Sequence, residues 1–181
     1  MKRAVDLIIA LPGLLVLAVA APFVVLMIRL DSPGPAIFTQ TRVGRGERRF
    51  RCFKFRTMYV GASEVPTHEA LERTITRVGR ALRASKIDEL PQLFNVVRGD
   101  MSLVGPRPCL LSQTKLIEER RARAVMDWLP GVTGLAQVRG VDMSDPLRLA
   151  EVDAEYVNSQ SLLLDLRIIC ATFLGRKFFQ L

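Results

Sequence analysis

Two adjacent carboxylates, Asp88 and Glu89, are the residues whose types and spacing best suit chemistry in this sequence. They follow Lys86 and precede Pro91, near the start of a helix predicted over residues 85–97. A helix N-terminus favours negative charge, so it keeps a carboxylate ionised. An ionised carboxylate can attack a phosphorus atom, or it can hold Mg²⁺ against a substrate diphosphate.

The same carboxylates also fit a purely structural role. The stretch from Ser85 to Asp88 matches a capping box, in which the Asp88 side chain only satisfies backbone amides at the helix start. The residue pattern by itself leaves capping and catalysis open, so other parts of the chain must decide between them.

A strip of basic side chains between residues 42 and 56 is the second candidate site. Lys54 and Arg56 lie two residues apart, so they can act together on a phosphate. The outer arginines suit anionic lipid headgroups instead, because a phosphate site rarely needs so many cations. Neither a Walker-type glycine loop nor a GxGxxG motif accompanies the strip.

Two stretches rich in glycine and proline are predicted to position side chains rigidly. The first, residues 99–108, carries Asp100 and Arg107, which either bind a metal and a phosphate or pair with each other in a structural turn. The second, residues 130–140, either offers backbone amides and Gln137 to a nucleobase or sugar, or forms a surface hairpin.

The element that begins the chain is an apolar run from Leu7 to Ile28, which contains Pro12 and Pro22 and no charged residue. Basic residues flank the run at both ends, and such flanks mark the cytoplasmic side of a membrane. We therefore expect residues 1–30 to form a re-entrant anchor, a helix that enters the bilayer, breaks near Pro22 and turns back. A spanning helix that its prolines only kink is the alternative.

The remaining elements are predicted to form a single domain over residues 31–181. Residues 36–41 and 50–55 suit a β-hairpin around a glycine turn, and residues 145–158 suit a helix with an aspartate cap. The apolar tail, residues 161–181, suits a helix in the membrane interface. The fold class is thus α+β and mostly helical, with a helix-break-helix anchor, interfacial amphipathic helices and a small hairpin.

Composition narrows the classes of partner. The 181-residue chain has a net charge of +8 and 49% hydrophobic residues, which suits a protein that lies on an anionic membrane and handles phosphorylated ligands. Three scattered cysteines form no metal-ligand spacing and no disulfide framework, so a reducing compartment is expected. Phe50, Phe53 and Phe55 alternate as in a buried strand, which argues against a nucleic-acid surface. His68 lies in a polar loop and is expected to be solvated.

Five blocks in a fixed order resemble those of one family, the bacterial sugar transferases, or small monotopic phosphoglycosyl transferases. They are Lys2-Arg3 with Asp6, SPGPAIFTQTRVG (32–44), FKFRTM (53–58), KIDELPQLFNVVRGDMSLVGPRP (86–108) and PGVTGLAQVRG (130–140). They extend over most of the chain, and the fourth is too long to match by chance. The resemblance favours catalysis over capping for Asp88.

This resemblance implies a reaction. Members of the family transfer a phospho-sugar from a UDP-sugar to a polyprenol phosphate and release UMP, with Mg²⁺ bridging the nucleotide diphosphate. By position in the motif, Asp88 is expected to be the nucleophile and to form a covalent aspartyl phospho-sugar. Glu89 is expected to help bind the metal or to position Asp88, so both carboxylates are predicted metal ligands.

Substrate-binding residues follow from the same blocks. Lys54, Arg56 and Arg107 are predicted phosphate contacts, Gln137 a contact to the nucleotide sugar, and Asp100 a residue that supports the site from behind. The resemblance further implies a catalytic domain on the cytoplasmic face of the bacterial inner membrane, in contact with lipids and serving polysaccharide, O-antigen or glycoprotein assembly. A homodimer remains open, and no nucleic acid is expected.

Departures from the commoner family pattern affect which UDP-sugar is expected as the donor substrate. Many members carry Trp at the position of Leu135 and Gly-Arg-Asn after Ala-Gln-Val, whereas here Gly140 is followed by Val141. Gln113 and residues 142–145 look more like members that use N-acetylated 6-deoxy amino sugars. The resemblance also implies a minimal form without the polytopic region of longer relatives. A membrane-anchored basic binding or scaffold protein without catalysis is the competing interpretation.

Overall fold

The computed structural model describes residues 1–61 and 74–174, and His68 lies outside these ranges. The described part is mostly helical, as the sequence predicted, and it contains two sheets of two strands each, of which only the hairpin was predicted. In chain order its elements are α1 (Lys2–Asp31), β1 (Ile37–Val43), η1 (Arg45–Glu47), β2 (Arg49–Phe55), α2 (Arg77–Ala84), η3 (Ile87–Glu89), α3 (Gln92–Arg98), β3 (Ser102–Val104), α4 (Thr114–Ala122), η4 (Val125–Asp127), β4 (Gly131–Thr133), α5 (Leu135–Arg139), α6 (Pro146–Ser159) and α7 (Leu162–Leu174).

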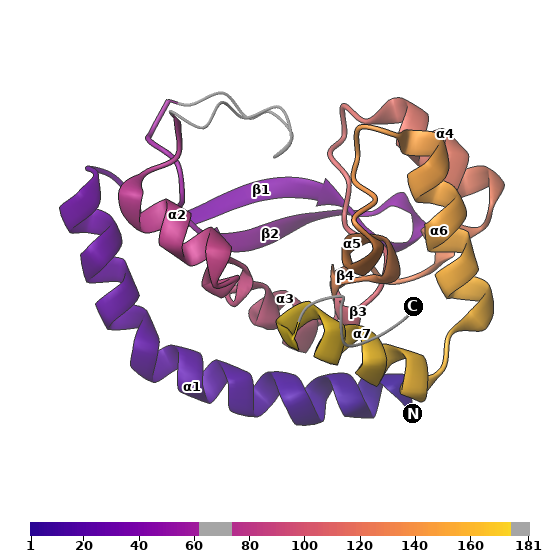
Figure 1. Cartoon of the computed structure of the whole chain (residues 1–181), viewed down its shortest axis with the longest axis horizontal. Coiled ribbons are helices and arrows are strands. Elements are labelled where there is room, and N and C mark those ends of the chain that lie inside the picture. The colour runs from indigo at the N-terminus through magenta and orange to yellow at the C-terminus, as the bar shows by residue number, and fades with distance from the viewer. Residues whose placement is uncertain (62–73, 175–181) are drawn as a thin grey trace.

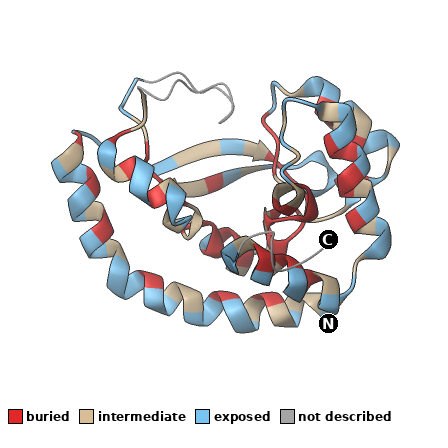
Figure 2. Ribbon diagram, viewed as in Figure 1, coloured by how far each residue is buried: buried red, intermediate tan, exposed pale blue. Residues whose placement is uncertain are grey.

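Helix α1 is a long arc along one side of the molecule, with the β1–β2 hairpin, α2 and α3 inside the arc (Figure 1). Ala10, Leu17 and Val24 lie seven residues apart and are buried, so a single stripe of the helix packs on the domain. Most of the rest of its surface is exposed and apolar (Figure 2). By length and composition, α1 is able to cross a membrane.

The predicted break near Pro22 is wrong, because α1 is one helix that continues through both Pro12 and Pro22. A proline removes one backbone hydrogen bond and pushes the preceding turn aside, which bends a helix without ending it when the flanking turns remain favourable. Packing supports the helix here, because Ala10, Leu17 and Val24 are buried against the domain. The arc in Figure 1 is therefore a bent helix and not two helices joined by a turn.

The first turn of α1 is bound to the domain by charged and polar side chains. The Lys2 ammonium lies 2.7 Å from an Asp165 carboxylate oxygen in α7. Arg3 donates to the last carbonyls of α3. The buried carboxylate of Asp6 accepts a hydrogen bond from the Ser102 hydroxyl at 2.9 Å. Three separate elements thus hold the N-terminal end of the helix.

The last turn of α1 is bound to the same domain. The Asp31 carboxylate accepts a hydrogen bond from the Val78 amide, at the start of α2, at 2.9 Å. The guanidinium of Arg56, just after β2, donates to the carbonyls of Ser32 and Pro33. It thereby holds the backbone that directly follows the helix. Both ends of the apolar helix are therefore fixed to one body.

The predicted hairpin is confirmed as the antiparallel pair β1 and β2, with Ile37 opposite Phe55 at the open end. Asn95 of α3 is fully buried and joins the hairpin to that helix. Its side-chain amide donates to the Arg51 carbonyl and accepts from the Phe53 amide. These two hydrogen bonds hold the backbone of β2 in place. They therefore fix the direction in which the following side chain, Lys54, points.

Strands β3 and β4 pair in parallel, with Ser102 opposite Gly131, so the two stretches rich in glycine and proline lie side by side. The predicted alternative of a surface hairpin over residues 130–140 is wrong, because this segment forms β4 and then α5. A Cβ at Gly131 would lie 2.1 Å from the Gly105 nitrogen, so the close approach of the two backbones requires glycine.

Helices α6 and α7 lie in the two C-terminal segments that the sequence predicted to be helical. The Asp145 side chain accepts a hydrogen bond from the Arg148 amide, which confirms the predicted cap of α6. Helix α7 covers the described part of the predicted interfacial tail. Large apolar side chains are exposed along it, namely Leu163, Leu166, Phe173 and Leu174. Such a surface suits the predicted contact with a membrane interface.

Candidate active site

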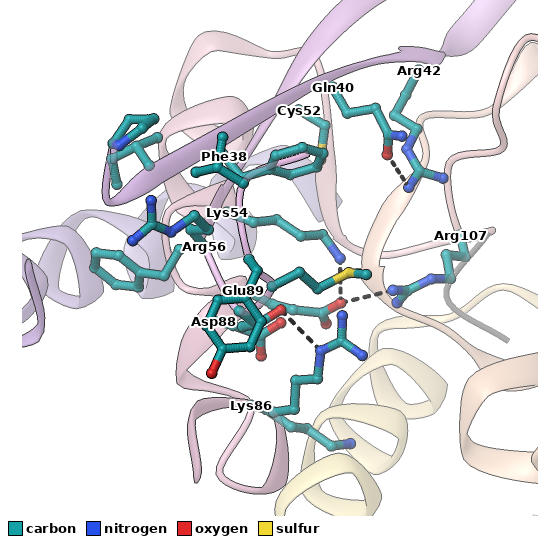
Figure 3. A pocket seen from close by; sticks show the side chains of 18 of the residues that line it. Phe38, Gln40, Arg42, Cys52, Lys54, Arg56, Lys86, Asp88, Glu89 and Arg107 are labelled. Atoms are coloured by element: carbon teal, nitrogen blue, oxygen red, sulfur yellow. Dashed lines mark hydrogen bonds and ion pairs between the residues drawn. The ribbon is translucent and has the colours of Figure 1, made fainter. Parts of the chain in front are cut away.

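A cavity of about 630 Å³ is bounded by the hairpin, the end of α2 and η3, and most of the predicted site residues line it (Figure 3). Its apolar wall includes Phe38, Phe55 and Tyr59. The polar and charged lining residues come from segments far apart in the sequence: Gln40, Arg42, Lys54, Arg56, Thr57, Arg83, Lys86, Asp88, Glu89, Arg107 and Gln137. The structure thus brings together every predicted site residue except Asp100.

The two carboxylates do not begin a long helix. Helix α2 ends at Ala84, Lys86 adopts a left-handed conformation, and the short 3₁₀ helix η3 carries Asp88 and Glu89. The Ser85 hydroxyl donates back to the carbonyls of α2 and caps nothing ahead of it. The capping-box prediction is therefore wrong. The Asp88 side chain therefore does not cap a helix as that prediction required.

Glu89 is the centre of an ion cluster. One of its oxygens accepts from the Lys54 ammonium at 2.7 Å and from the Arg107 guanidinium at 2.9 Å. Burial by itself would raise the pKa of Glu89, but the charges of Arg107 and Lys54 outweigh it and hold this pKa far below its usual range. Glu89 in turn raises the pKa of Arg107. Glu89 and Arg107 therefore stay ionised at neutral pH. Burial, and then the charge of Arg107, lower the pKa of Lys54, and the charge of Glu89 opposes that shift.

Asp88, one residue away, has the opposite environment. Its side chain is buried at the cavity wall, and in the described part of the chain its carboxylate makes no hydrogen bond. Burial raises the pKa of Asp88, and the neighbouring charge of Glu89 raises it further. Lys54 and Arg83 offset only part of this shift. The site therefore holds a poorly stabilised anion, which suits a nucleophile.

Arg83 is a cavity residue that the sequence reasoning missed. Its Nε donates to the Thr57 hydroxyl at 2.9 Å, which anchors one side of the guanidinium and leaves the other for a ligand. Burial lowers the pKa of Arg83, and the charge of Asp88 opposes that shift. It lies on α2 five residues before Asp88, and only the sharp turn at Lys86 brings the two side chains to one cavity. No spacing rule of a regular helix gives that signal.

Two predicted site residues have other partners. Arg56 lines the cavity, but its guanidinium is engaged with Ser32 and Pro33 at the end of α1. Asp100 lies 3.3 Å from the Arg98 guanidinium and is absent from the cavity lining. The predicted alternative in which Asp100 only pairs with Arg107 is also wrong, because Arg107 binds Glu89.

Gln137 lies in the cavity wall with one side-chain atom unsatisfied. Its Nε2 donates weakly to the Val132 carbonyl at 3.4 Å, while its buried Oε1 has no hydrogen-bond partner in the described chain. A buried acceptor without a donor costs free energy, so the site gains if a ligand supplies an N–H or O–H group. This supports the predicted role of Gln137 in binding a nucleobase or a sugar.

The donor set is compatible with Mg²⁺ bound together with a substrate. In residues 1–61 and 74–174 no three His, Cys, Asp or Glu side chains cluster into a metal site. Asp88 and the second oxygen of Glu89 still offer one or two carboxylate ligands facing the cavity. Mg²⁺ commonly binds through one or two carboxylates and completes its shell with phosphates and water.

Comparisons with known proteins show which family this chain is similar to. The family model described as bacterial sugar transferase matches residues 1–177. An undecaprenyl-phosphate glucose phosphotransferase from Komagataeibacter xylinus is 43% identical, over 94% of this chain and 35% of its own length. A UDP-glucose:undecaprenyl-phosphate glucose-1-phosphate transferase from Caulobacter vibrioides is 42% identical, over 94% and 67%.

A third relative differs in the sugar that it is named for. The UDP-N-acetylgalactosamine-undecaprenyl-phosphate N-acetylgalactosaminephosphotransferase of Aeromonas hydrophila is 36% identical, over 94% of this chain and 42% of its own length. The chain thus spans between about a third and two thirds of the length of these three relatives.

Replacing the two carboxylates one at a time by their amides should change stability in different ways. Glu89→Gln removes the charge that Lys54 and Arg107 share, and we expect a loss of about 3 kcal/mol, the low end for a buried pair, since 17% of the side chain is exposed. Asp88→Asn removes an anion that its surroundings disfavour, so its melting temperature should be unchanged or higher. Calorimetry in detergent measures the stability of both variants. An equal loss of stability in the two would contradict the different roles assigned to Glu89 and Asp88.

Proposed function

This chain belongs to the bacterial sugar transferase family, and we propose that it transfers a phospho-sugar from a UDP-sugar to a polyprenol phosphate, with release of UMP. The observation that carries the proposal is the Asp88 carboxylate, which has no hydrogen bond within residues 1–61 and 74–174 and lies among cations in one cavity. The names of the relatives, which specify undecaprenyl phosphate, support the same class of acceptor.

In the first step the Asp88 carboxylate attacks the β-phosphorus of the UDP-sugar. A bond forms between the Asp88 oxygen and phosphorus, and the bond from that phosphorus to the oxygen shared with the α-phosphate breaks, so UMP leaves with that oxygen. An anion cannot approach a diphosphate unless nearby cations offset the repulsion. Lys54 and Arg107 supply that charge, and Arg83 adds a cation beside Asp88.

In the second step an oxygen of the polyprenol phosphate attacks the same phosphorus. The bond from phosphorus to Asp88 breaks, which regenerates the carboxylate and yields a polyprenol diphospho-sugar. One cavity can therefore serve two anionic substrates in turn, which is ping-pong catalysis. Glu89 holds Lys54 and Arg107 at the same places through both steps, because its ion pairs do not depend on either substrate.

Asp88 and Glu89 would hold Mg²⁺ against the nucleotide diphosphate, and when bound it would offset the charge that develops on the UMP leaving group. Gln137 would accept a hydrogen bond from the uracil or the sugar through its unsatisfied Oε1. For the donor we keep an N-acetylated 6-deoxy amino sugar as the candidate from the sequence, to be compared with glucose and N-acetylgalactosamine, which the relatives' names specify.

We propose that α1 is re-entrant and that the site lies at the cytoplasmic face of the bacterial inner membrane. Its first turn is bound through Lys2, Arg3 and Asp6, and its last turn through Asp31, all to the same domain. A helix that spans the bilayer would place its ends on opposite faces, so these contacts favour an anchor that enters and leaves on one side. The exposed apolar surface of α1 would then lie in lipid.

Asp88→Asn should abolish turnover while the protein stays folded, because an amide is not a comparable nucleophile. Without lipid, the wild type should release about one UMP per active site in a burst, and the variant none. With undecaprenyl phosphate, the rate should fall at least about 10³-fold. Asp127→Asn, an exposed acid in the corresponding 3₁₀ helix η4, is the matched control and should behave as wild type. Near-normal UMP release by Asp88→Asn would exclude it as the attacking group.

Removal of divalent metal should stop the reaction. In excess EDTA the burst and the steady-state release of UMP should both disappear, and added Mg²⁺ should restore them, because the diphosphate leaving group needs charge compensation. UMP release measured by a coupled assay is the readout. Unchanged release in EDTA would exclude the proposed metal role without touching the role of Asp88.

The re-entrant arrangement predicts that both ends of α1 react with an impermeant maleimide from the cytoplasmic side alone. Single cysteines before Met1 and at Pro33, in a Cys170→Ser background, would be labelled in inside-out vesicles and protected in intact cells. The remaining cysteines, Cys52 and Cys109, are buried. If the two ends are labelled from opposite sides, α1 spans the membrane and the proposal is wrong.

A further inference from the structure

Lys86 combines a costly backbone conformation with a place in the cavity wall. In the described residues three side-chain-bearing positions have a left-handed backbone, Glu47, Lys86 and Ala124, with φ of 59°, 59° and 56°. Glycine adopts this conformation without the steric cost that a Cβ brings. Of the three, only Lys86 lines the cavity. Such a conformation at a candidate site is a reason to look for a role of the side chain.

Ala124 provides an internal comparison, because it has the same structural position. Lys86 follows the last residues of α2 and precedes the 3₁₀ helix η3. Ala124 follows the last residues of α4 and precedes the 3₁₀ helix η4. This is the position after a helix that glycine most often occupies. The backbone at Lys86 thus requires a left-handed turn but gives no reason for a long cationic side chain.

The other cations of the cavity are already engaged within the protein. Each makes a hydrogen bond: Lys54 and Arg107 to Glu89, Arg42 to Gln40, Arg56 to Ser32 and Arg83 to Thr57. In residues 1–61 and 74–174, the Lys86 ammonium has no hydrogen bond and no ion pair. Its side chain is exposed at the edge of the cavity, away from the Glu89 cluster (Figure 3).

We propose that the Lys86 ammonium binds a substrate phosphate at the rim of the cavity. The inference rests on the proposed function for the identity of the phosphates, which belong to the nucleotide donor or to the lipid acceptor. Lys54 and Arg107 share the charge of Glu89, so the inner cluster supplies only part of the charge that two successive anionic substrates need. A compact ammonium with three free N–H donors at the entrance supplies the rest.

The test compares Lys86→Gly, Lys86→Arg and Ala124→Gly in detergent-solubilised full-length protein. Calorimetric titration with UDP and, separately, with farnesyl phosphate measures equilibrium binding independently of turnover. Lys86→Gly should weaken binding of one of the two ligands by about fivefold or more, because a charge-assisted hydrogen bond is lost. Lys86→Arg should stay within about twofold of wild type. The ligand that is affected identifies the source of the phosphate.

Ala124→Gly separates the backbone effect from the side-chain effect. Both glycine variants relax a left-handed residue, so neither should lower the melting temperature, and Ala124→Gly should leave both affinities unchanged. If Lys86→Gly binds both ligands as wild type does, or if Ala124→Gly weakens binding equally, the inference is wrong. If the wild type binds UDP but releases no UMP with any donor, the proposed function is wrong. The binding measurements on the Lys86 variants would still test the inference, because they do not depend on turnover.

Discussion

The ion cluster around Glu89 is the interaction on which the arrangement of the site depends. Lys54 comes from β2, Arg107 from the segment after β3 and Glu89 from η3, so a single carboxylate oxygen joins three parts of the chain. None of the three charges is stable in a partly buried place by itself. Their mutual compensation fixes the cavity wall before any substrate arrives, and Asn95 holds β2 in the register that this requires.

Two neighbouring residues of nearly the same chemistry acquire different roles from this cluster. Two cations bind Glu89 and lower its pKa, so it stays ionised. Burial and the charge of Glu89 raise the pKa of Asp88. Environments that separate the pKa values of two adjacent carboxylates are a common way to assign distinct tasks to them. The ion cluster therefore organises the cavity and also sets the charge state and reactivity of the residue beside it.

The features that depend on a local sequence pattern could be predicted from the sequence. The alternation in β2, the glycine turn and the cap at Asp145 were enough to predict the hairpin and the start of α6, and motif resemblance selected Asp88 over capping. Arg83 was missed because its approach to Asp88 depends on the left-handed turn at Lys86, which no helical periodicity predicts. Arg56 was predicted as a phosphate contact because of its charge, although its guanidinium binds the carbonyls of Ser32 and Pro33, which are distant in sequence. Helix α1 continues through its two prolines as a bent helix, and the stripe of it that is buried packs against the domain.

The attachment of the first turn of α1 imposes an order on biosynthesis. Lys2 is made 163 residues before its partner Asp165, and Asp6 is made 96 residues before Ser102. At about 5–20 residues per second, roughly 10–30 s separate synthesis of Lys2 from that of Asp165. During this interval an apolar helix is exposed without the domain that later covers its buried stripe. Contact of the nascent helix with the bilayer or with a chaperone would shield this apolar surface until the domain is complete.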